Sequence, residues 1–339
     1  MGFADKFDIM KLNKTIFYLI AGMMFFFNCL FPEISNAQTC CSGGVPMAGN
    51  VGGMAPADRG TLQVSIGFDG NFLRTLKEGT ETINDRSRLR TTYSGLLNAY
   101  YSVNDRLSVE GLLSFVRQER DIRQGEFNDF ISTMGPGDVV LLLNYVYLSK
   151  NQIVLRVGAG PKFPTGPSDL RNNDGITLNA DLQPGSGAMD IFFNHMFSLS
   201  PGFRPASTIV HTFTYRVTGE NPAYLGSQRY SFGNELHMSL GVSEQDLVGK
   251  MLMSYGLNIR YRHAARDIIN GHLLPNTGGQ WIFLMPSVSW HISSRAALNI
   301  NSELPLYSRV DGTQLTPTFR INAGVYLKIG PGGDLLSGF

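Results

Sequence analysis

Polar side chains, charged ones among them, alternate with apolar side chains in several segments of this 339-residue chain. In 318–329, Arg320 and Lys328 alternate with apolar residues, and Arg260 does the same in 251–262. Successive side chains of a β-strand point to opposite faces, so these segments predict strands with one apolar and one polar face. Such a polar face could guide solutes through a passage. Its charges could equally pair with one another and fill a narrow interior, and the sequence leaves both interpretations open.

The same alternation, followed along the whole chain, places a set of charged residues on the polar face. We take them as the candidate lining of a transport path: Arg88, Arg90, Glu110, Arg156, Lys162, Asp190, Arg216, Glu235, Arg260, Arg262, Glu303 and Arg320. Basic residues outnumber acidic ones in this set, which favours anionic or polar solutes.

Two pairs of histidine and serine raise the possibility of hydrolysis. His237 and Ser239 share one face of a predicted strand, as a base and its nucleophile would, and His291 and Ser293 repeat the spacing. However, Leu236 and its apolar neighbours take the opposite face, so the first pair points away from lipid. We therefore predict that the protein is not an enzyme, and an outer-membrane lipid hydrolase is the least favoured alternative. The sequence predicts no metal site and no cofactor, and no glycine run leads into a nucleotide-binding motif.

Composition narrows the class of protein. Charged residues make up 16% of the chain and aromatic residues 11%, with a net charge of +1. Soluble domains average about 25% charged residues. The near-neutral charge gives no reason to expect nucleic acid as a partner. A closed β-barrel meets an apolar solvent with every backbone N–H and C=O group paired, so low charge without a helical span in the body of the chain favours a barrel.

The length and order of the segments predict an all-β fold, an antiparallel transmembrane β-barrel of about 12 strands. We place the strands near 61–72, 87–103, 105–118, 137–149, 151–163, 187–199, 203–217, 229–242, 250–263, 280–292, 295–305 and 318–329. The connections alternate between short turns and longer loops, the latter at 119–136, 164–186, 218–228, 264–279 and 306–317. This alternation is typical of bacterial outer-membrane barrels, which have short periplasmic turns and longer extracellular loops. Both ends of the barrel would then be periplasmic.

The N-terminal segment predicts secretion. An apolar run at 16–31 follows two lysines and precedes Ser35-Asn36-Ala37, the pattern of a signal peptide with its cleavage site. Met1 and Met10 are both possible start residues. We expect a signal peptide at 1–37, a glycine-rich periplasmic leader at 38–60, the barrel at 61–330 and a C-terminal tail at 331–339.

Two adjacent cysteines lie in the predicted leader. Cys40 and Cys41 could form disulfides in the oxidising periplasm, take part in thiol or soft-metal chemistry, or mark a lipid attachment site. The sequence assigns them no role. The predicted barrel itself contains no cysteine, so no disulfide framework holds it.

Three short motifs occur in a fixed order. They are GPGDVVL at 135–141, GAGPKFPTG at 158–166 and GSGAMD at 185–190, each at a junction between a loop and a predicted strand. In this order and spacing they resemble the outer-membrane family named for the meta-pathway of phenol degradation. The resemblance implies a β-barrel and transport of small, often hydrophobic compounds. The Cys-Cys leader and the tail depart from the family pattern, and the tail leaves open whether Phe339 acts as an assembly signal.

Together these features predict a porin-like outer-membrane channel or transporter for small molecules, including hydrophobic or aromatic compounds. Its expected partners are outer-membrane lipids, the small-molecule solute and the barrel-assembly machinery. The main alternative is a structural or adhesion barrel with a closed lumen. Lys162, Asp169, Arg171 and Asp174 mark the loop at 164–186 as the expected entrance or constriction.

Overall fold

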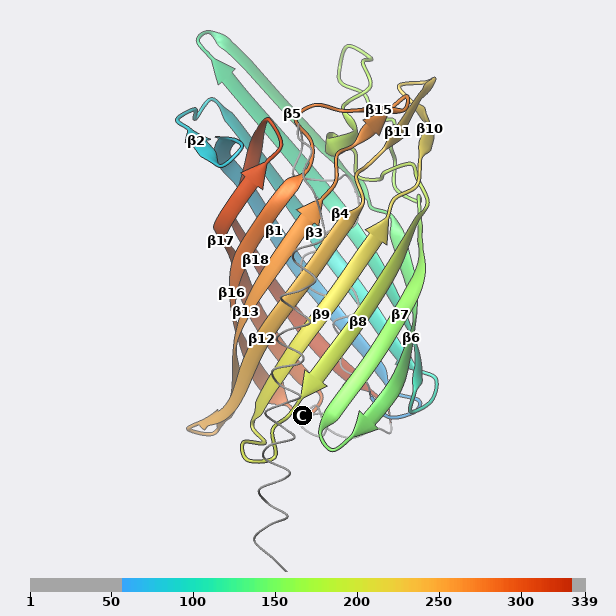
Figure 1. Ribbon diagram of the computed structural model, residues 1–339, viewed down its shortest axis with the longest axis vertical. Coiled ribbons are helices and arrows are strands. Elements are labelled where there is room, and N and C mark those ends of the chain that lie inside the picture. Colours follow the sequence, from blue (N-terminus) through green and yellow to red (C-terminus); the bar gives the residue numbers. More distant parts are fainter. Residues whose placement is uncertain (1–56, 331–339) are drawn as a thin grey trace, which may run out of the picture. The chain divides into compact units, whose positions relative to one another are not determined.

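The computed structural model describes residues 57–330, which form a closed antiparallel β-barrel (Figure 1). The predicted strand number is confirmed, because 12 strands make up the ring. They are β1 (Leu62–Glu78), β3 (Arg88–Ser102), β4 (Leu107–Gln124), β6 (Val139–Lys150), β7 (Ile153–Phe163), β8 (Asp190–Leu199), β9 (Ser207–Val217), β12 (Glu235–Val248), β13 (Met251–Ala264), β16 (Gly279–Ser293), β17 (Ala296–Val310) and β18 (Thr313–Ile329).

Each barrel strand pairs with its neighbours in sequence, and the first strand pairs with the last. Leu62 of β1 lies opposite Ile329 of β18, and the ladder continues to Glu78 opposite Thr313. This pairing closes the ring and leaves neither strand with an open edge along that ladder.

The two faces of the wall differ as the alternation predicts. On β13, Leu257 and Ile259 are exposed on the outer face, whereas Arg260 is buried on the inner face. His195 of β8 also lies on the outer face, where its Nε2 is 2.9 Å from the Tyr147 hydroxyl. An apolar outer face suits contact with lipid, and a tyrosine with a histidine suits the interfacial aromatic girdle.

The connections are shorter at one end of the barrel than at the other. The short-turn end carries the connections 103–106, 151–152, 200–206, 249–250 and 294–295. The other end carries longer segments, and we call it the long-loop end. In an outer-membrane barrel this end faces the cell exterior.

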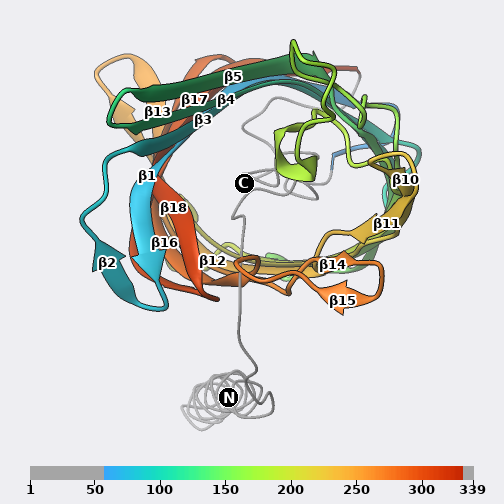
Figure 2. The same cartoon turned by 90° about the horizontal axis from the view of Figure 1, so that it is seen from above.

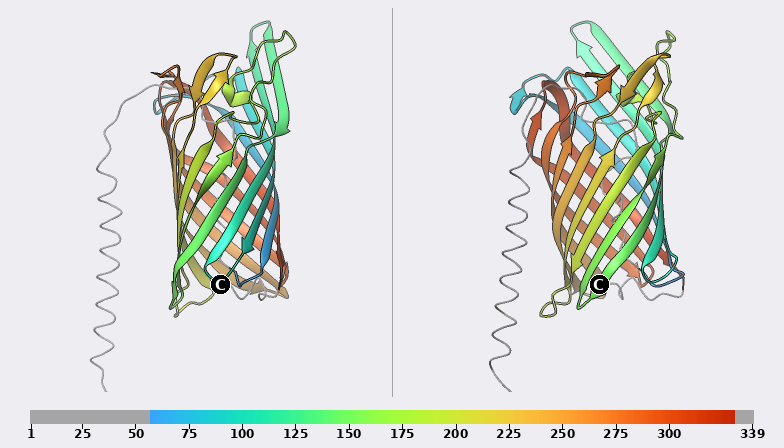
Figure 3. Two further views of the ribbon diagram at one scale, coloured as in Figure 1. Left: turned by 90° about the vertical axis from the view of Figure 1, so that its right-hand side faces the viewer. Right: turned by 45° about the vertical axis from the view of Figure 1, so that its right-hand side comes forward.

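Three of the predicted connections are wrong. The expected loop at 306–317 is a tight hairpin, because β17 ends at Val310 and β18 begins at Thr313. In place of the loop at 119–136, β4 continues and β5 (Phe127–Pro136) folds back against it (Figure 3). The turn expected at 243–249 is also strand, since β12 continues to Val248. The part of a strand that projects out of the bilayer does not contact lipid, so it needs no apolar face. The alternation of apolar and polar residues therefore stops before the strand itself ends.

Short elements cover the long-loop end. β2 (Glu81–Ile83) pairs with β1, and η1 (Ala180–Leu182) is a single 3₁₀ turn. A separate small sheet, which we call the cap sheet, contains β10 (Asn221–Tyr224), β11 (Gln228–Ser231), β14 (Ile268–Ile269) and β15 (His272–Leu273). The predicted barrel strand at 229–242 begins too early, because residues 229–231 belong to β11 of the cap sheet.

The predicted signal peptide, the leader with Cys40 and Cys41, and the tail at 331–339 lie outside the described residues, apart from the last few positions of the leader. Within 57–330, no helix is both long enough and apolar enough to cross a membrane.

Candidate functional site

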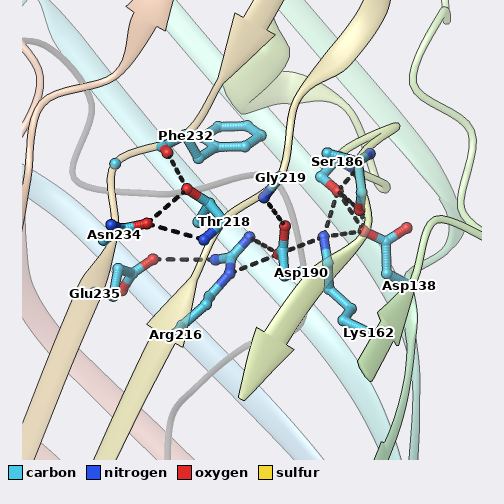
Figure 4. A network of polar contacts seen from close by, with 12 residues as sticks. Asp138, Lys162, Ser186, Asp190, Arg216, Thr218, Gly219, Phe232, Asn234 and Glu235 are labelled. Atoms are coloured by element: carbon cyan, nitrogen blue, oxygen red, sulfur yellow. Dashed lines mark hydrogen bonds and ion pairs between the residues drawn. The ribbon is translucent and has the colours of Figure 1, made fainter. Parts of the chain in front are cut away.

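A chain of ion pairs runs around the inner wall near the long-loop end (Figure 4). The Lys162 Nζ lies 2.7 Å from Asp138 Oδ2 and 2.8 Å from Asp190 Oδ2. Arg216 then bridges Asp190, at 2.7 Å, and Glu235, at 3.1 Å. These five residues come from the start of β6 and from β7, β8, β9 and β12. They alternate in sign from one strand to the next.

Strand register explains this arrangement. Lys162 lies directly opposite Asp190 in the β7–β8 ladder, and Arg216 lies opposite Glu235 in the β9–β12 ladder. Opposite charges at directly paired positions stabilise a sheet, whereas like charges there would destabilise it. The ion pairs therefore favour the observed register over one shifted by a single residue, which would turn these charges to the outer face.

Further ion pairs of the inner wall involve β13, β17, β18 and β1. Glu235 also accepts from Arg262 of β13, at 3.0 Å. Arg260 pairs with Glu303 of β17. Arg320 of β18 forms a bidentate ion pair with Asp69 of β1, with N–O distances of 2.7 and 3.0 Å. We call the whole set the charge belt: Asp69, Asp138, Lys162, Asp190, Arg216, Glu235, Arg260, Arg262, Glu303 and Arg320.

The carboxylates of the charge belt also hold backbone groups of the long loops. Asp138 accepts hydrogen bonds from the Gly166 N–H and the Ser186 N–H, both at 3.1 Å. Asp190 accepts from the Gly219 N–H at 2.9 Å. Charge-assisted bonds of this kind are stronger than bonds between neutral groups. The belt therefore fixes where the loops start and end as well as the wall.

Aromatic and aliphatic side chains adjoin the belt on the inner wall. The Arg262 guanidinium lies 5.0 Å from the Trp281 ring centroid, and that of Arg260 lies 5.1 Å from Phe283. The same two rings pack with Leu73 and Val310 in a buried cluster, which we call the inner apolar patch. Cation–π contacts of this type let the arginines border an apolar surface while they keep their carboxylate partners.

The wall between β3 and β8 carries a second polar group nearer the short-turn end. Glu110 accepts from the amides of Asn98, at 2.9 Å, and Asn144, at 3.2 Å. Arg156 lies 5.7 Å from the Tyr100 ring. All five side chains are buried on the inner face.

The connection 164–189, which we call the plug loop, folds inward at the long-loop end (Figure 2). Arg90 of β3 donates to the side chain and the backbone carbonyl of Asp181. The Gln118 Nε2 of β4 donates to the Gln183 carbonyl at 3.0 Å. The Thr133 hydroxyl of β5 donates to the Leu182 carbonyl at 2.5 Å. These contacts hold η1 against β3, β4 and β5.

Glycines allow the two ends of the plug loop to meet. A Cβ atom on Gly185 would lie 2.3 Å from the Gly166 carbonyl oxygen, and Gly187 has a φ of +68° next to Asn221. Only glycine fits such a close backbone approach and such a conformation without strain. The glycines of the second and third sequence motifs thus shape the base of this loop.

The cap sheet packs against the plug loop through a buried aromatic cluster of Ala180, Tyr224, Tyr230 and Phe232. The Tyr224 hydroxyl accepts the Ala180 N–H at 3.3 Å. The Tyr230 hydroxyl donates to Asp267 at 2.6 Å. Burial raises the pKa of Asp267 to about 7, although the bonds from Tyr230 and from Gly233 N–H oppose this rise. Burial and the neighbouring Asp267 raise the pKa of Tyr230 as well.

The structure brings most of the predicted lining residues together on the inner wall. Arg88 is the exception, because it lies at the rim and is 3.6 Å from Asp85, with 44% of its side chain exposed. Of the residues expected to mark the loop constriction, Lys162 belongs to the charge belt, but Asp169 and Asp174 are exposed at the loop surface. Arg171 donates only within the loop, to the Gly175 carbonyl at 3.4 Å.

Sequence reasoning missed the residues that hold the plug loop and the cap. Asp181, Gln183 and Asp267 lie in connections, where no periodic pattern marks them, and Tyr230 lies where the alternation predicts the start of a barrel strand instead of a cap strand. One indication was present in the sequence for Asp138, because this residue lies inside the first of the three motifs.

Both histidines of the predicted histidine–serine pairs have other hydrogen-bond partners. The His237 Nε2 is 3.1 Å from Glu235, while the Ser239 hydroxyl is 2.6 Å from that of Thr212. The His291 Nε2 contacts Ser254 at 2.9 Å instead. Among the described residues, no group of three His, Cys, Asp or Glu side chains is placed to hold a metal ion.

The fold is that of an outer-membrane barrel of known structure. An outer-membrane channel from Pseudomonas putida F1 superposes with a TM-score of 0.64 at 14% identity, over 83% of this chain and 99% of that chain. Weaker likenesses include the toluene transporter TodX of P. putida, with a TM-score of 0.42 at 9% identity over 81% of this chain and 91% of that one. The β domain of the Bordetella autotransporter BrkA gives 0.43 at 10% identity, over 78% and 100%. No family model and no curated protein matches the sequence, so membership of the meta-pathway family stays a prediction.

Proposed function

We propose that the protein is an outer-membrane channel that conducts small molecules between the long-loop end and the short-turn end. The observation that carries this proposal is the plug loop, which folds inward and is held by inner-wall residues such as Arg90 and Gln118. Loops or a helix fill the lumen of some outer-membrane barrels, whereas porins keep a water-filled channel, so the plug loop marks the place where a passage would be restricted. The likeness in fold to the P. putida F1 channel supports the same role. Location in the outer membrane, after secretion and assembly by the barrel-assembly machinery, is part of the proposal.

The inner wall favours small hydrophobic or aromatic solutes over ions. The charge belt holds five basic residues, Lys162, Arg216, Arg260, Arg262 and Arg320, and as many acidic ones, each in a pair or network. Paired charges of this kind present little net field to an ion, so the anion preference suggested by the sequence has no support in the belt. The four residues of the inner apolar patch are at most 2% exposed, so they would give a hydrophobic solute a surface to follow only after the packing over them has moved.

The paired charges also favour the alternative of a structural barrel with a closed lumen. Arg156, Lys162 and Arg216 are each at most 1% exposed, so in this arrangement they are packed against other groups. A barrel that serves only as an anchor would keep this packing permanently.

Solute flux through the refolded protein separates the two functions. Purified protein in planar bilayers is expected to show discrete conductance steps with weak ion selectivity, and in vesicles it is expected to admit neutral aromatic solutes. Asp181→Ala, which releases the plug loop from Arg90, is expected to raise both signals several-fold. Asp169→Ala is the matched control on the exposed part of the same loop and is expected to change neither. If the folded wild type and the folded Asp181→Ala variant both show neither conductance nor solute uptake, the result would support the structural barrel instead.

A further inference from the structure

Asp267 occupies the joint between the barrel and the cap sheet. It lies in the connection that leads from β13 to β14, and only 5% of the residue is exposed. Its Oδ2 accepts from the Tyr230 hydroxyl at 2.6 Å and its Oδ1 accepts from the Gly233 N–H at 2.8 Å. Its own N–H donates to the Thr277 hydroxyl at 2.8 Å. The carboxyl group of Asp267 thus joins the connection that follows β13 to β11 and to the connection that leads from β11 to β12.

The hydrogen-bond donors to this carboxyl group, the Tyr230 hydroxyl and the Gly233 N–H, are neutral, in contrast to those of the charge belt. The charged groups that face it are Asp181 of η1 and Glu235 of β12, which both raise its pKa. Its neighbour Arg266 has its guanidinium 3.9 Å from Asp311. Asp181 and Glu235 are themselves paired, with Arg90 and with Arg216. The titratable group on β11 that contacts Asp267 is Tyr230, whose phenol stays protonated because its pKa is raised, whereas Arg229 of the same strand is exposed and pairs with Glu220.

The contacts of Asp267 reach the plug loop through a short series of rings. The Tyr230 ring lies 4.8 Å from that of Tyr224 and 5.1 Å from that of Phe232. Tyr224 holds the Ala180 N–H at the start of η1. The next residue, Asp181, pairs with Arg90 on the inner wall. Loss of the hydrogen bonds to Asp267 therefore weakens the aromatic packing that holds η1 in place inside the barrel.

We propose that the cap sheet and the plug loop form a pH-controlled lid on the channel, in which the protonated Asp267 keeps the lid closed and the ionised Asp267 releases it. This inference rests on the proposed function, since it names the regulation of the same passage. The ionised carboxylate is stable in water but is poorly solvated at the joint, so opening relieves it.

The sign follows from the pKa values of the two states. An open lid exposes Asp267, whose ordinary pKa is 3.8, whereas in the closed lid it is about 7. Both states are protonated below the lower value, so the lid is tightest there. As pH rises between the two values, the open state loses its proton first, and the ratio of open to closed lids increases by up to about tenfold per pH unit. Above the higher value the ratio is constant.

Amide hydrogen exchange of the full-length protein in detergent or vesicles tests the lid without any transport signal. We compare the wild type with Asp267→Asn at the same pH, so that the intrinsic pH dependence of exchange cancels. Near pH 3.5 the two proteins are expected to exchange similarly at 178–186 and 228–233. Near pH 7.5 the wild type is expected to exchange these segments on the order of a thousandfold faster than the variant, because the two pKa values lie about three pH units apart. Asp169→Asn is the control and is expected to follow the wild type at both values.

Tyr230→Phe provides a second test in case Asp267→Asn disturbs the folding of the cap sheet. The phenol stabilises the carboxylate more than the acid, so its loss is expected to speed exchange mainly near pH 7.5. Equal acceleration at both pH values would show that Tyr230 only packs, and equal exchange of the wild type and Asp267→Asn at both values would overturn the lid.

Conductance recorded over the same pH range separates the two proposals. Steps whose open probability rises with pH in the wild type but not in Asp267→Asn support both. Exchange that responds to pH in a protein that never conducts supports the lid and rejects the channel. Conductance and exchange that are both independent of pH support the channel and reject the lid.

Discussion

The barrel wall and the cap both bury carboxylates, but they compensate the buried charge in different ways. In the wall, Asp190 lies between Lys162 and Arg216, at 2.8 and 2.7 Å. In the cap, Asp267 meets the Tyr230 hydroxyl and the Gly233 N–H. The two cations beside Asp190 balance its charge at short range, whereas the partners of Asp267 are neutral and burial raises the pKa of that carboxyl group to about 7. The comparison assigns a permanent structure to the wall and a responsive one to the cap.

The largest effect is expected from breaking the charge belt. Arg216→Ala leaves Asp190 and Glu235 without the guanidinium between them, so we expect a loss of about 3–5 kcal/mol in the free energy of unfolding. Urea unfolding in lipid vesicles, followed by tryptophan fluorescence, measures it.

Arg204→Ala is the matched control for that variant. Arg204 also pairs with a carboxylate, Glu244, at 3.0 Å, but its side chain is 65% exposed. Exposed pairs contribute little, so no measurable shift in the unfolding midpoint is expected. Equal losses in the two variants would mean that burial does not distinguish the belt from a surface pair.

A smaller effect is expected from the outer face of the same wall. Leu257→Arg places a charge on the lipid-facing side and is expected to cost about 2–4 kcal/mol. Asn258→Arg, one residue further on, points inward and is expected to be tolerated. Similar damage at both positions, in the same unfolding assay, would contradict the assignment of faces.

The cap is expected to respond locally. Tyr230→Phe removes the hydroxyl that Asp267 accepts from, so the free energy of cap opening should fall by about 1–2 kcal/mol. Global unfolding should stay unchanged, because the cap sheet pairs with none of the barrel strands. Hydrogen exchange of 228–233 and urea unfolding measure the two quantities side by side. A matching loss in global stability would show that the cap and the wall unfold as one unit.

The smallest effect is expected at the exposed part of the plug loop. Arg171→Ala removes a side chain that donates only to the Gly175 carbonyl, so stability should change by less than about 0.5 kcal/mol and conductance should not change. A clear change in conductance would restore Arg171 to the transport path.

The alternation of side chains was sufficient to predict the wall. It gave the strand number and the inward direction of Arg216, Glu235 and Arg260, because each strand inside a bilayer must turn an apolar face to lipid. It failed where strands leave the bilayer. The β4–β5 hairpin carries charges on both faces, among them Arg120 and Asp129, which pair at 3.1 Å across the two strands.

The pairing of the wall charges and the whole of the cap could not be predicted from one sequence. Which charges meet depends on the stagger between neighbouring strands, which is a property of the closed ring. The cap depends on distant segments, such as Tyr230 opposite Ile269. Nothing in the local pattern of either segment marks its partner.

The closure of the ring by β1 and β18 has a consequence for how the chain folds. Asp69 and Arg320, which meet across that seam, lie 251 residues apart in the sequence. Contacts of such long range form slowly, because most of the chain must be ordered before they are made. Until then β1 presents an unpaired edge that could accept a strand from another molecule. The seam is therefore the step at which a nascent barrel most needs a chaperoning surface, and misassembly is expected to begin there.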